Sequence, residues 1–73
     1  MIAIEMSGDF TFREFASNRR ELSRMIESAK SWLFSHGYRK FIRESRETIS
    51  AYSRSGGRVL ITTSQTSPEG VRV

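Results

Sequence analysis

The chain has 73 residues, a formal net charge of +4, one His and no Cys. A chain of this length forms one domain, residues 1–73, and buries only roughly 60% of the surface that its unfolded form exposes. Disulfides and the usual zinc sites are excluded because the sequence lacks thiols and has a single His. We therefore expect no metal and no cofactor, and a stability that depends on efficient packing, on a homodimer or on another partner.

The distribution of apolar and basic residues limits where the protein is expected to be located and which partners it is expected to bind. No apolar run reaches the ~20 residues that a membrane span needs, and the N-terminus lacks the segments of a secretory signal, so we expect a cytoplasmic protein without a membrane segment. Arginine supplies ten of the 12 basic residues, and guanidinium groups pair with phosphate or carboxylate in bidentate geometry. Two interpretations follow: an anionic partner, either nucleic acid or an acidic protein surface, or a charge that only keeps a small domain soluble.

The N-terminal residues predict a β-hairpin. Apolar residues alternate along Ile2–Met6 and again along Phe10–Arg13, and the two runs are joined by a turn that contains Gly8. The alternation places Phe10 and Phe12 on the same face as the apolar residues of the first run.

The next segment predicts an amphipathic helix from about Asn18 to Ser35. Its apolar residues follow the spacing of one helical face, and they are Leu22, Met25, Ile26, Ala29, Trp32 and Leu33. Asn18 and Glu21 have the spacing of a capping box, with Ser17 as the alternative cap, and Gly37 suits the left-handed residue that ends a helix.

Residues 38–54 predict a second helix by the same spacing. The apolar face would contain Tyr38, Phe41, Ile42, Ile49 and Tyr52. On its polar side Arg39, Arg43, Arg46 and Arg54 would form a band, flanked by Glu44 and Glu47.

The last part of the chain predicts one or two strands. Arg58–Thr63 is a β-rich run, and Ser67–Gly70 has the Pro and Gly positions of a type I turn. Val71–Val73 would then return as a short edge strand, or else residues 64–73 form a mobile tail. The expected fold class is α+β: a small antiparallel sheet covered on one face by two helices, in the order ββααβ(β).

The arginine band is the main functional indication. Arg39, Lys40, Arg43 and Arg46 could contact phosphates, with Arg19 and Arg20 of the first helix at the edge of the same surface if the two patches adjoin. Taken alone, such a band is more often a solvated face with Arg–Glu pairs. Phe34 lies off the apolar face of the first helix, so it is either an exposed interface anchor or a side chain packed on Tyr38 or Phe41.

Other functional classes receive less support. A strand followed by two helices is similar in outline to ribbon-helix-helix DNA binders, but the preceding hairpin partner and the strand after the helices argue against that class. His36 beside Tyr38 or Glu44 suggests a general base, yet a single His at a helix end is more often a partner of the helix dipole. No serine lies in a nucleophile motif, so we do not expect an enzyme.

Two functional hypotheses remain. The first is a small non-enzymatic regulatory protein that binds a nucleic acid or a nucleic-acid–protein complex through helix-borne arginines. The second is a phage- or plasmid-type effector that inhibits a host enzyme, for example transcription machinery, by docking on its acidic surface through the same arginines and Phe34 or a strand edge. A toxin or antitoxin fragment ranks third.

Overall fold

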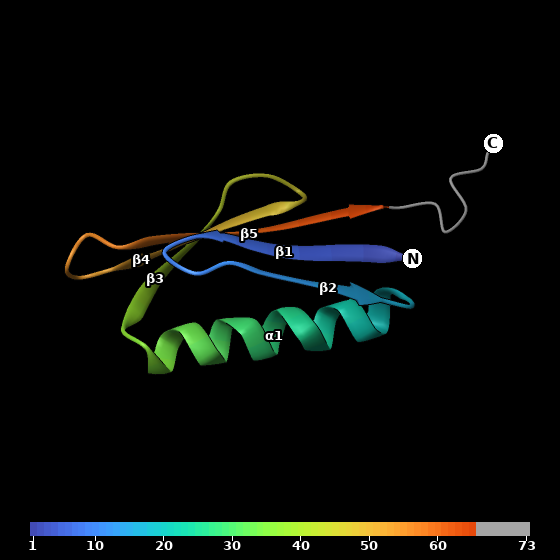
Figure 1. Cartoon of the computed structure of the whole chain (residues 1–73), viewed down its shortest axis with the longest axis horizontal. Helices are drawn as coiled ribbons and strands as arrows, with labels where there is room; N and C mark the ends of the chain where they lie inside the picture. The colour runs from blue at the N-terminus through green and yellow to red at the C-terminus, as the bar shows by residue number, and fades with distance from the viewer. Residues whose placement is uncertain (66–73) are drawn as a thin grey trace.

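The computed structural model describes residues 1–65, which form a five-stranded antiparallel sheet with one helix across one face (Figure 1). The elements in chain order are β1 (Ile2–Gly8), β2 (Phe12–Ala16), α1 (Arg19–Ser35), β3 (Tyr38–Arg43), β4 (Thr48–Ser53) and β5 (Arg58–Gln65). The strand order is β2-β1-β5-β4-β3, so β5 lies in the centre and joins the N-terminal hairpin to the β3–β4 hairpin.

The prediction of two helices over a small sheet is wrong. Within residues 1–65 α1 is the only helix, and residues 38–54, assigned above to a second helix, form the hairpin β3–β4. The physical reason is that the residues between the two strands form a turn, in which the amides of Glu44 and Ser45 donate to the carbonyl of Thr48. The strands on either side are then paired in register, with Phe41 opposite Ala51 and therefore on the same face of the sheet.

This correction also changes the predicted apolar face. Ile49 is buried beneath α1, whereas Ile42 lies on the opposite face of the sheet and 38% of its surface is exposed. A strand alternates its side chains between two faces, so Ile42 and Tyr52 cannot share a face with Phe41 and Ile49.

The predicted N-terminal hairpin and first helix are present. Ile4 lies opposite Glu14 and Met6 opposite Phe12, and the preceding Phe10 packs half-buried against the core. The Asn18 side chain accepts a hydrogen bond from the Glu21 amide at 2.8 Å, as in a capping box. The Glu21 carboxylate reaches back as expected, but it accepts from the amide of Ser17, the residue before the cap, at 2.7 Å.

The helix ends at the expected glycine. Gly37 has φ +98°, a conformation that residues with a Cβ rarely adopt. Its amide donates to the carbonyl of Phe34, and the chain then turns into β3.

The core lies between α1 and the face of the sheet that it covers. It consists mainly of aliphatic side chains from α1 and four of the strands, and β3 contributes Tyr38. The aliphatic residues include Ile2, Ile4, Ala16, Leu22, Leu33, Ala51, Val59 and Ile61. Within residues 1–65 no element covers the other face (Figure 1). The predicted strand at Arg58–Thr63 is β5, which continues through Ser64 to Gln65. The predicted turn at Ser67–Gly70 and strand at Val71–Val73 lie outside the described residues.

Candidate functional site

Positive charge is concentrated in one part of the sheet. Residues 38–58 contain six basic and two acidic side chains, a net charge of +4, whereas residues 1–37 contain five of each sign and have a net charge of zero, with His36 neutral. The first group comprises β3, β4, their turn and the start of β5. The net charge of residues 38–58 therefore equals the net charge of the whole chain. We call residues 38–58 the basic half.

A basic row crosses the uncovered face of the basic half. Lys40 of β3 lies opposite Tyr52 of β4, and Tyr52 lies opposite Arg58 of β5, so the three side chains project from the same face. The Arg58 guanidinium carbon is 5.9 Å from the centre of the Tyr52 ring. Lys40 and Arg58 are exposed and Tyr52 is half-buried. We call Lys40, Tyr52 and Arg58 the basic row; the exposed Arg54 lies in the adjoining β4–β5 turn.

An acidic side chain limits the basic row toward the β3–β4 turn. Ser50 is fully buried, and its hydroxyl donates to Glu44 Oε2 at 2.8 Å. Because Ser50 is opposite Ile42 and Leu60, this carboxylate lies on the uncovered face, one row away from Tyr52. The continuous positive surface therefore ends before this point.

The predicted arginines of the supposed second helix do not share one environment. The Arg39 guanidinium carbon lies 4.2 Å from the centre of the Phe34 ring. Arg43 Nη1 donates to the carbonyls of Ser45 at 3.3 Å and Arg46 at 3.0 Å, so it holds the β3–β4 turn together. None of these residues is borne by a helix, because Arg39, Lys40 and Arg43 belong to β3 and Arg46 to the turn.

The two arginine patches of the sequence do adjoin at one point. Arg19 at the start of α1 and Arg46 of the β3–β4 turn line the same small hollow. Arg20 is exposed in the first turn of α1. Phe34 is exposed over 49% of its surface, and the Arg39 guanidinium lies over its ring. A role as an interface anchor stays a prediction.

Two residues of the basic row were missed as candidates. Tyr52 was assigned to a buried helical face, and Arg58 was seen only as the first residue of a strand. The available signal was the alternation of Ile49 and Ala51 with Ser50 and Tyr52, which is a strand pattern. Their proximity to Lys40 follows from the two strand registers.

A hydrogen-bonded junction connects the basic half to the N-terminal hairpin. Asp9, just after β1, accepts hydrogen bonds at one carboxylate oxygen from the Tyr38 hydroxyl at 2.6 Å and from the Arg58 amide at 3.1 Å. The hydrogen bond to Asp9, then burial and the Asp9 charge, raises the pKa of Tyr38 above its usual value.

At the start of α1 the hydrogen bonds from Ser17 lower the pKa of Glu21. Both groups thus have structural roles.

The His considered as a general base also has a structural environment. The His36 ring stacks on Trp32 with ring centres 4.0 Å apart, and its Nδ1 lies 2.8 Å from the Trp32 carbonyl oxygen. Tyr38, its proposed neighbour in catalysis, donates its hydroxyl to Asp9. Among residues 1–65 no three His, Cys, Asp or Glu side chains are close enough together to hold a metal ion.

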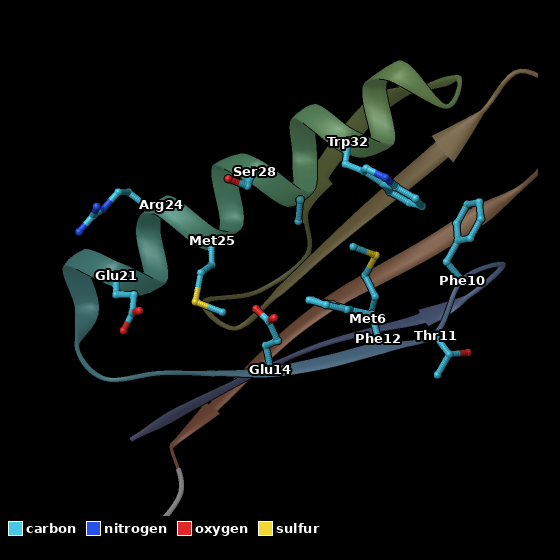
Figure 2. A pocket seen from close by; sticks show the side chains of 11 residues that line it. Met6, Phe10, Thr11, Phe12, Glu14, Glu21, Arg24, Met25, Ser28 and Trp32 are labelled. Atoms are coloured by element: carbon cyan, nitrogen blue, oxygen red, sulfur yellow. The ribbon is translucent and has the colours of Figure 1, made fainter.

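An apolar groove lies on the other side of the molecule, between α1 and β2 (Figure 2). Its volume is about 740 Å³. The apolar part of the lining is formed by Met6, Phe10, Phe12, Met25 and Trp32, and Glu14 projects from β2 toward α1. Trp32 is exposed over 43% of its surface, and its ring packs edge-on against Phe10 with centres 5.0 Å apart.

In the described part of the chain, the helix is too short and too polar to cross a membrane. Comparison of the chain with protein-family models, with curated proteins and with solved structures found no match.

Proposed function

We propose that this protein is a small non-enzymatic regulatory protein that binds single-stranded nucleic acid on the uncovered face of its sheet. The observation that carries the proposal is the basic row: an aromatic ring between two cations on an open sheet surface. A base would stack on Tyr52, and the flanking phosphates would contact Lys40 and Arg58, with Arg54 beside them.

The geometry favours a single strand over a duplex. The helix that could have entered a major groove is absent, since Arg39, Arg43 and Arg46 lie on a strand and a turn. An aromatic ring on a sheet can stack only on an unpaired base, because the bases of a duplex are already stacked on each other. Cations on both sides of the ring match the alternation of base and phosphate along one strand.

The experiment is a salt titration with unstructured, fluorescently labelled RNA and DNA of about 12 nucleotides, followed by anisotropy. For a single strand the logarithm of affinity falls with the logarithm of salt concentration by about 0.7 per phosphate contact. The double variant Lys40→Ala/Arg58→Ala should therefore reduce this slope by about 1.4. Tyr52→Leu should weaken binding by a factor of roughly 5 to 100, the value of one stacked base, and leave the slope unchanged.

The matched control is Arg13→Ala/Lys30→Ala. It also removes two positive charges, but from side chains that pair with Glu5 and Glu27 outside the basic half. It should leave the salt slope as it is. If the control weakens binding as much as the Lys40/Arg58 variant does, binding depends on the net charge of the protein and not on the basic row. Absence of binding at low salt would refute the proposal.

A second candidate function has its own observation. Phe34 is exposed, and Arg39 stacks on its ring, so the pair presents an aromatic side chain and a cation together. Such a pair is typical of the residues that dominate protein interfaces. It supports the hypothesis of an effector that docks on an acidic surface of a host enzyme. Phe34→Ala should then abolish capture of that enzyme from nuclease-treated lysate, while nucleic-acid binding by the basic row stays intact.

A further inference from the structure

The groove between α1 and β2 has a free strand edge beside it. In the sheet order β2 is an edge strand, paired only with β1 among the described residues. Alternate backbone groups of such a strand point away from the sheet and are free to pair with an added strand. Four of its five residues are exposed, including Phe12 and Phe15. A strand added here would direct every second side chain toward the groove (Figure 2).

The charge at this groove differs from that of the basic half. Glu14 projects into the groove, and no described residue makes an ion pair or a side-chain hydrogen bond with it. Glu21 also lines the groove, but its carboxylate caps α1. Among the lining residues that lie within 1–65, Arg24 is the one cation, so these residues have a formal charge of −1 in a protein of charge +4. A phosphate backbone is disfavoured here, and a partner with a basic side chain is favoured.

A second copy of this chain is a poor occupant. When two identical edge strands pair antiparallel about a two-fold axis, one residue lies opposite its own copy, and the helices of both copies lie on the same side. Centring the pair on Arg13 or Glu14 opposes like charges, which destabilises a strand pair. Centring it on Phe12 or Phe15 leaves part of the five-residue strand unpaired. The edge therefore favours a different sequence.

We propose that β2 and the groove bind an extended segment of another protein by strand addition. The segment has an apolar, a basic and an apolar residue at alternate positions, with the basic side chain opposite Glu14 and the apolar ones opposite Phe12 and Ala16. This site is independent of the basic row, which lies on the opposite face of the sheet. The protein would then join a nucleic acid and a protein segment at the same time.

The probe is a capped synthetic peptide, Ser-Leu-Thr-Lys-Thr-Leu-Ser, whose core reads the same in both directions and therefore suits either strand orientation. Trp32 is the only tryptophan and lines the groove, so its emission reports occupancy. The full chain should show a saturable blue shift with this peptide. A peptide with Glu in place of Lys should bind roughly three- to tenfold more weakly, as expected for one cross-strand charge pair.

A charge exchange tests the site itself. In Glu14→Lys the preference should reverse, so that the Glu peptide binds more tightly than the Lys peptide. Glu14 is exposed, and within residues 1–65 its carboxylate makes no ion pair or side-chain hydrogen bond. The matched control is Glu27→Lys, the same charge change on α1 outside the groove lining, which should keep the preference for Lys.

Backbone pairing is tested by N-methylation of alternate residues of the peptide. One alternating pattern should weaken the blue shift more than the other, because an added strand pairs through one edge and that edge differs between the two orientations. N-methylation of every residue blocks both edges and should abolish the shift. Three results would overturn the proposal: no shift at millimolar peptide, equal effects of Glu14→Lys on both peptides, or a dimer in sedimentation equilibrium that the peptides do not dissociate.

Discussion

β2 and β3 are the two edge strands of the described sheet. β3 has features that protect an edge from pairing with another strand, and β2 lacks them. β3 contains Arg39, Lys40 and Arg43 and has a register irregularity between Tyr38 and Lys40. Cations and an irregular register are the features by which proteins protect an edge from strand addition. β2 has one charge of each sign and two exposed phenylalanines, of which Phe12 lines the apolar groove and Phe15 lies on the uncovered face of the sheet.

This contrast teaches that the charge of the protein cannot be treated as uniform. The basic half has a net charge of +4 and residues 1–37 have none. The proposed partners differ accordingly, with an anion on the β3 side and an apolar, basic segment on the β2 side. The contrast requires that the β2 side and the β3 side belong to one sheet. The first tests therefore change residues at the junction between the two sides.

The largest expected effect is at the junction of the two sides. Gly8, at the end of β1, has φ +111°, and a Cβ there would lie 2.4 Å from the Arg58 carbonyl oxygen of β5. Gly8→Ala combines an unfavourable backbone conformation with a backbone clash, so it should lower the free energy of unfolding by at least about 3 kcal/mol. The measurement is urea denaturation followed by circular dichroism.

Gly37→Ala is the matched control for this prediction. Gly37 has φ +98°, but a Cβ added there meets no atom within 4 Å. Only the conformational cost remains, and the loss should be about 1–2 kcal/mol. Equal losses in the two variants would show that the close approach of β1 and β5 is not what holds the junction.

An intermediate effect is expected from Tyr38 at alkaline pH. Its hydrogen bond to Asp9 raises the pKa of the phenol in the folded protein, whereas the unfolded chain titrates near the usual value of about 10. The unfolded state therefore loses its proton first. The stability that this group contributes is fully present below that pH and is lost as the pH rises through the raised, folded-state pKa.

The measurement is the midpoint of urea denaturation as a function of pH. Tyr38→Phe should flatten the alkaline decline, while Tyr52→Phe, which removes a hydroxyl without a described hydrogen bond, should retain it. If stability declines as steeply in Tyr38→Phe, the titration of other groups causes the decline. The hydrogen bond from Tyr38 to Asp9 would then contribute little to the free energy of unfolding.

The parts of the fold that the sequence predicts are those with local signals. The cap residues Asn18 and Glu21 and the glycine at position 37 define α1, and alternation defines the N-terminal hairpin. A run of residues with high β propensity defines β5. Each signal lies within one element and its ends. The strand pairing that puts β5 in the centre of the sheet is not a local property, and the sequence did not indicate it.

The β3–β4 hairpin was mistaken for a helix because two periods coincide over its residues. Its apolar positions fit a helical face, while its alternation is interrupted by the irregularity after Tyr38 and by a turn without Gly or Pro. The turn is held by backbone hydrogen bonds and by Arg43, which composition does not reveal. β-branched Thr48 and Ile49 favoured a strand, but the periodicity outweighed them.

The candidate sites depend on the same long-range pairing. Lys40, Tyr52 and Arg58 meet only because two registers align them across three strands. The predicted helical band of Arg39, Arg43 and Arg46 is wrong, because these residues lie on β3 and its turn. Their role in binding a partner stays a prediction. The groove likewise requires the position of α1 over β2, which the apolar spacing of α1 does not fix.

The smallest expected effect separates two arginines that the sequence grouped together. Arg43 donates to two turn carbonyls, so Arg43→Ala should cost about 0.5–1.5 kcal/mol of folding free energy. Arg46 donates no described side-chain hydrogen bond, and Arg46→Ala should change stability by less than about 0.5 kcal/mol. Urea denaturation measures both, and the salt titration of RNA binding is repeated on the same samples.

Stability and salt slope together show whether the arginines at the β3 edge stabilise the fold or bind nucleic acid. Neither arginine belongs to the basic row, so both variants should keep the salt slope of the wild-type protein. A reduced slope in Arg46→Ala would extend the nucleic-acid surface around the β3 edge toward Arg19, which lines the same hollow. A reduced slope in Arg43→Ala with unchanged stability would mean that its guanidinium binds phosphate instead of the turn. The edge would then be a binding surface along its whole length and not a protected strand.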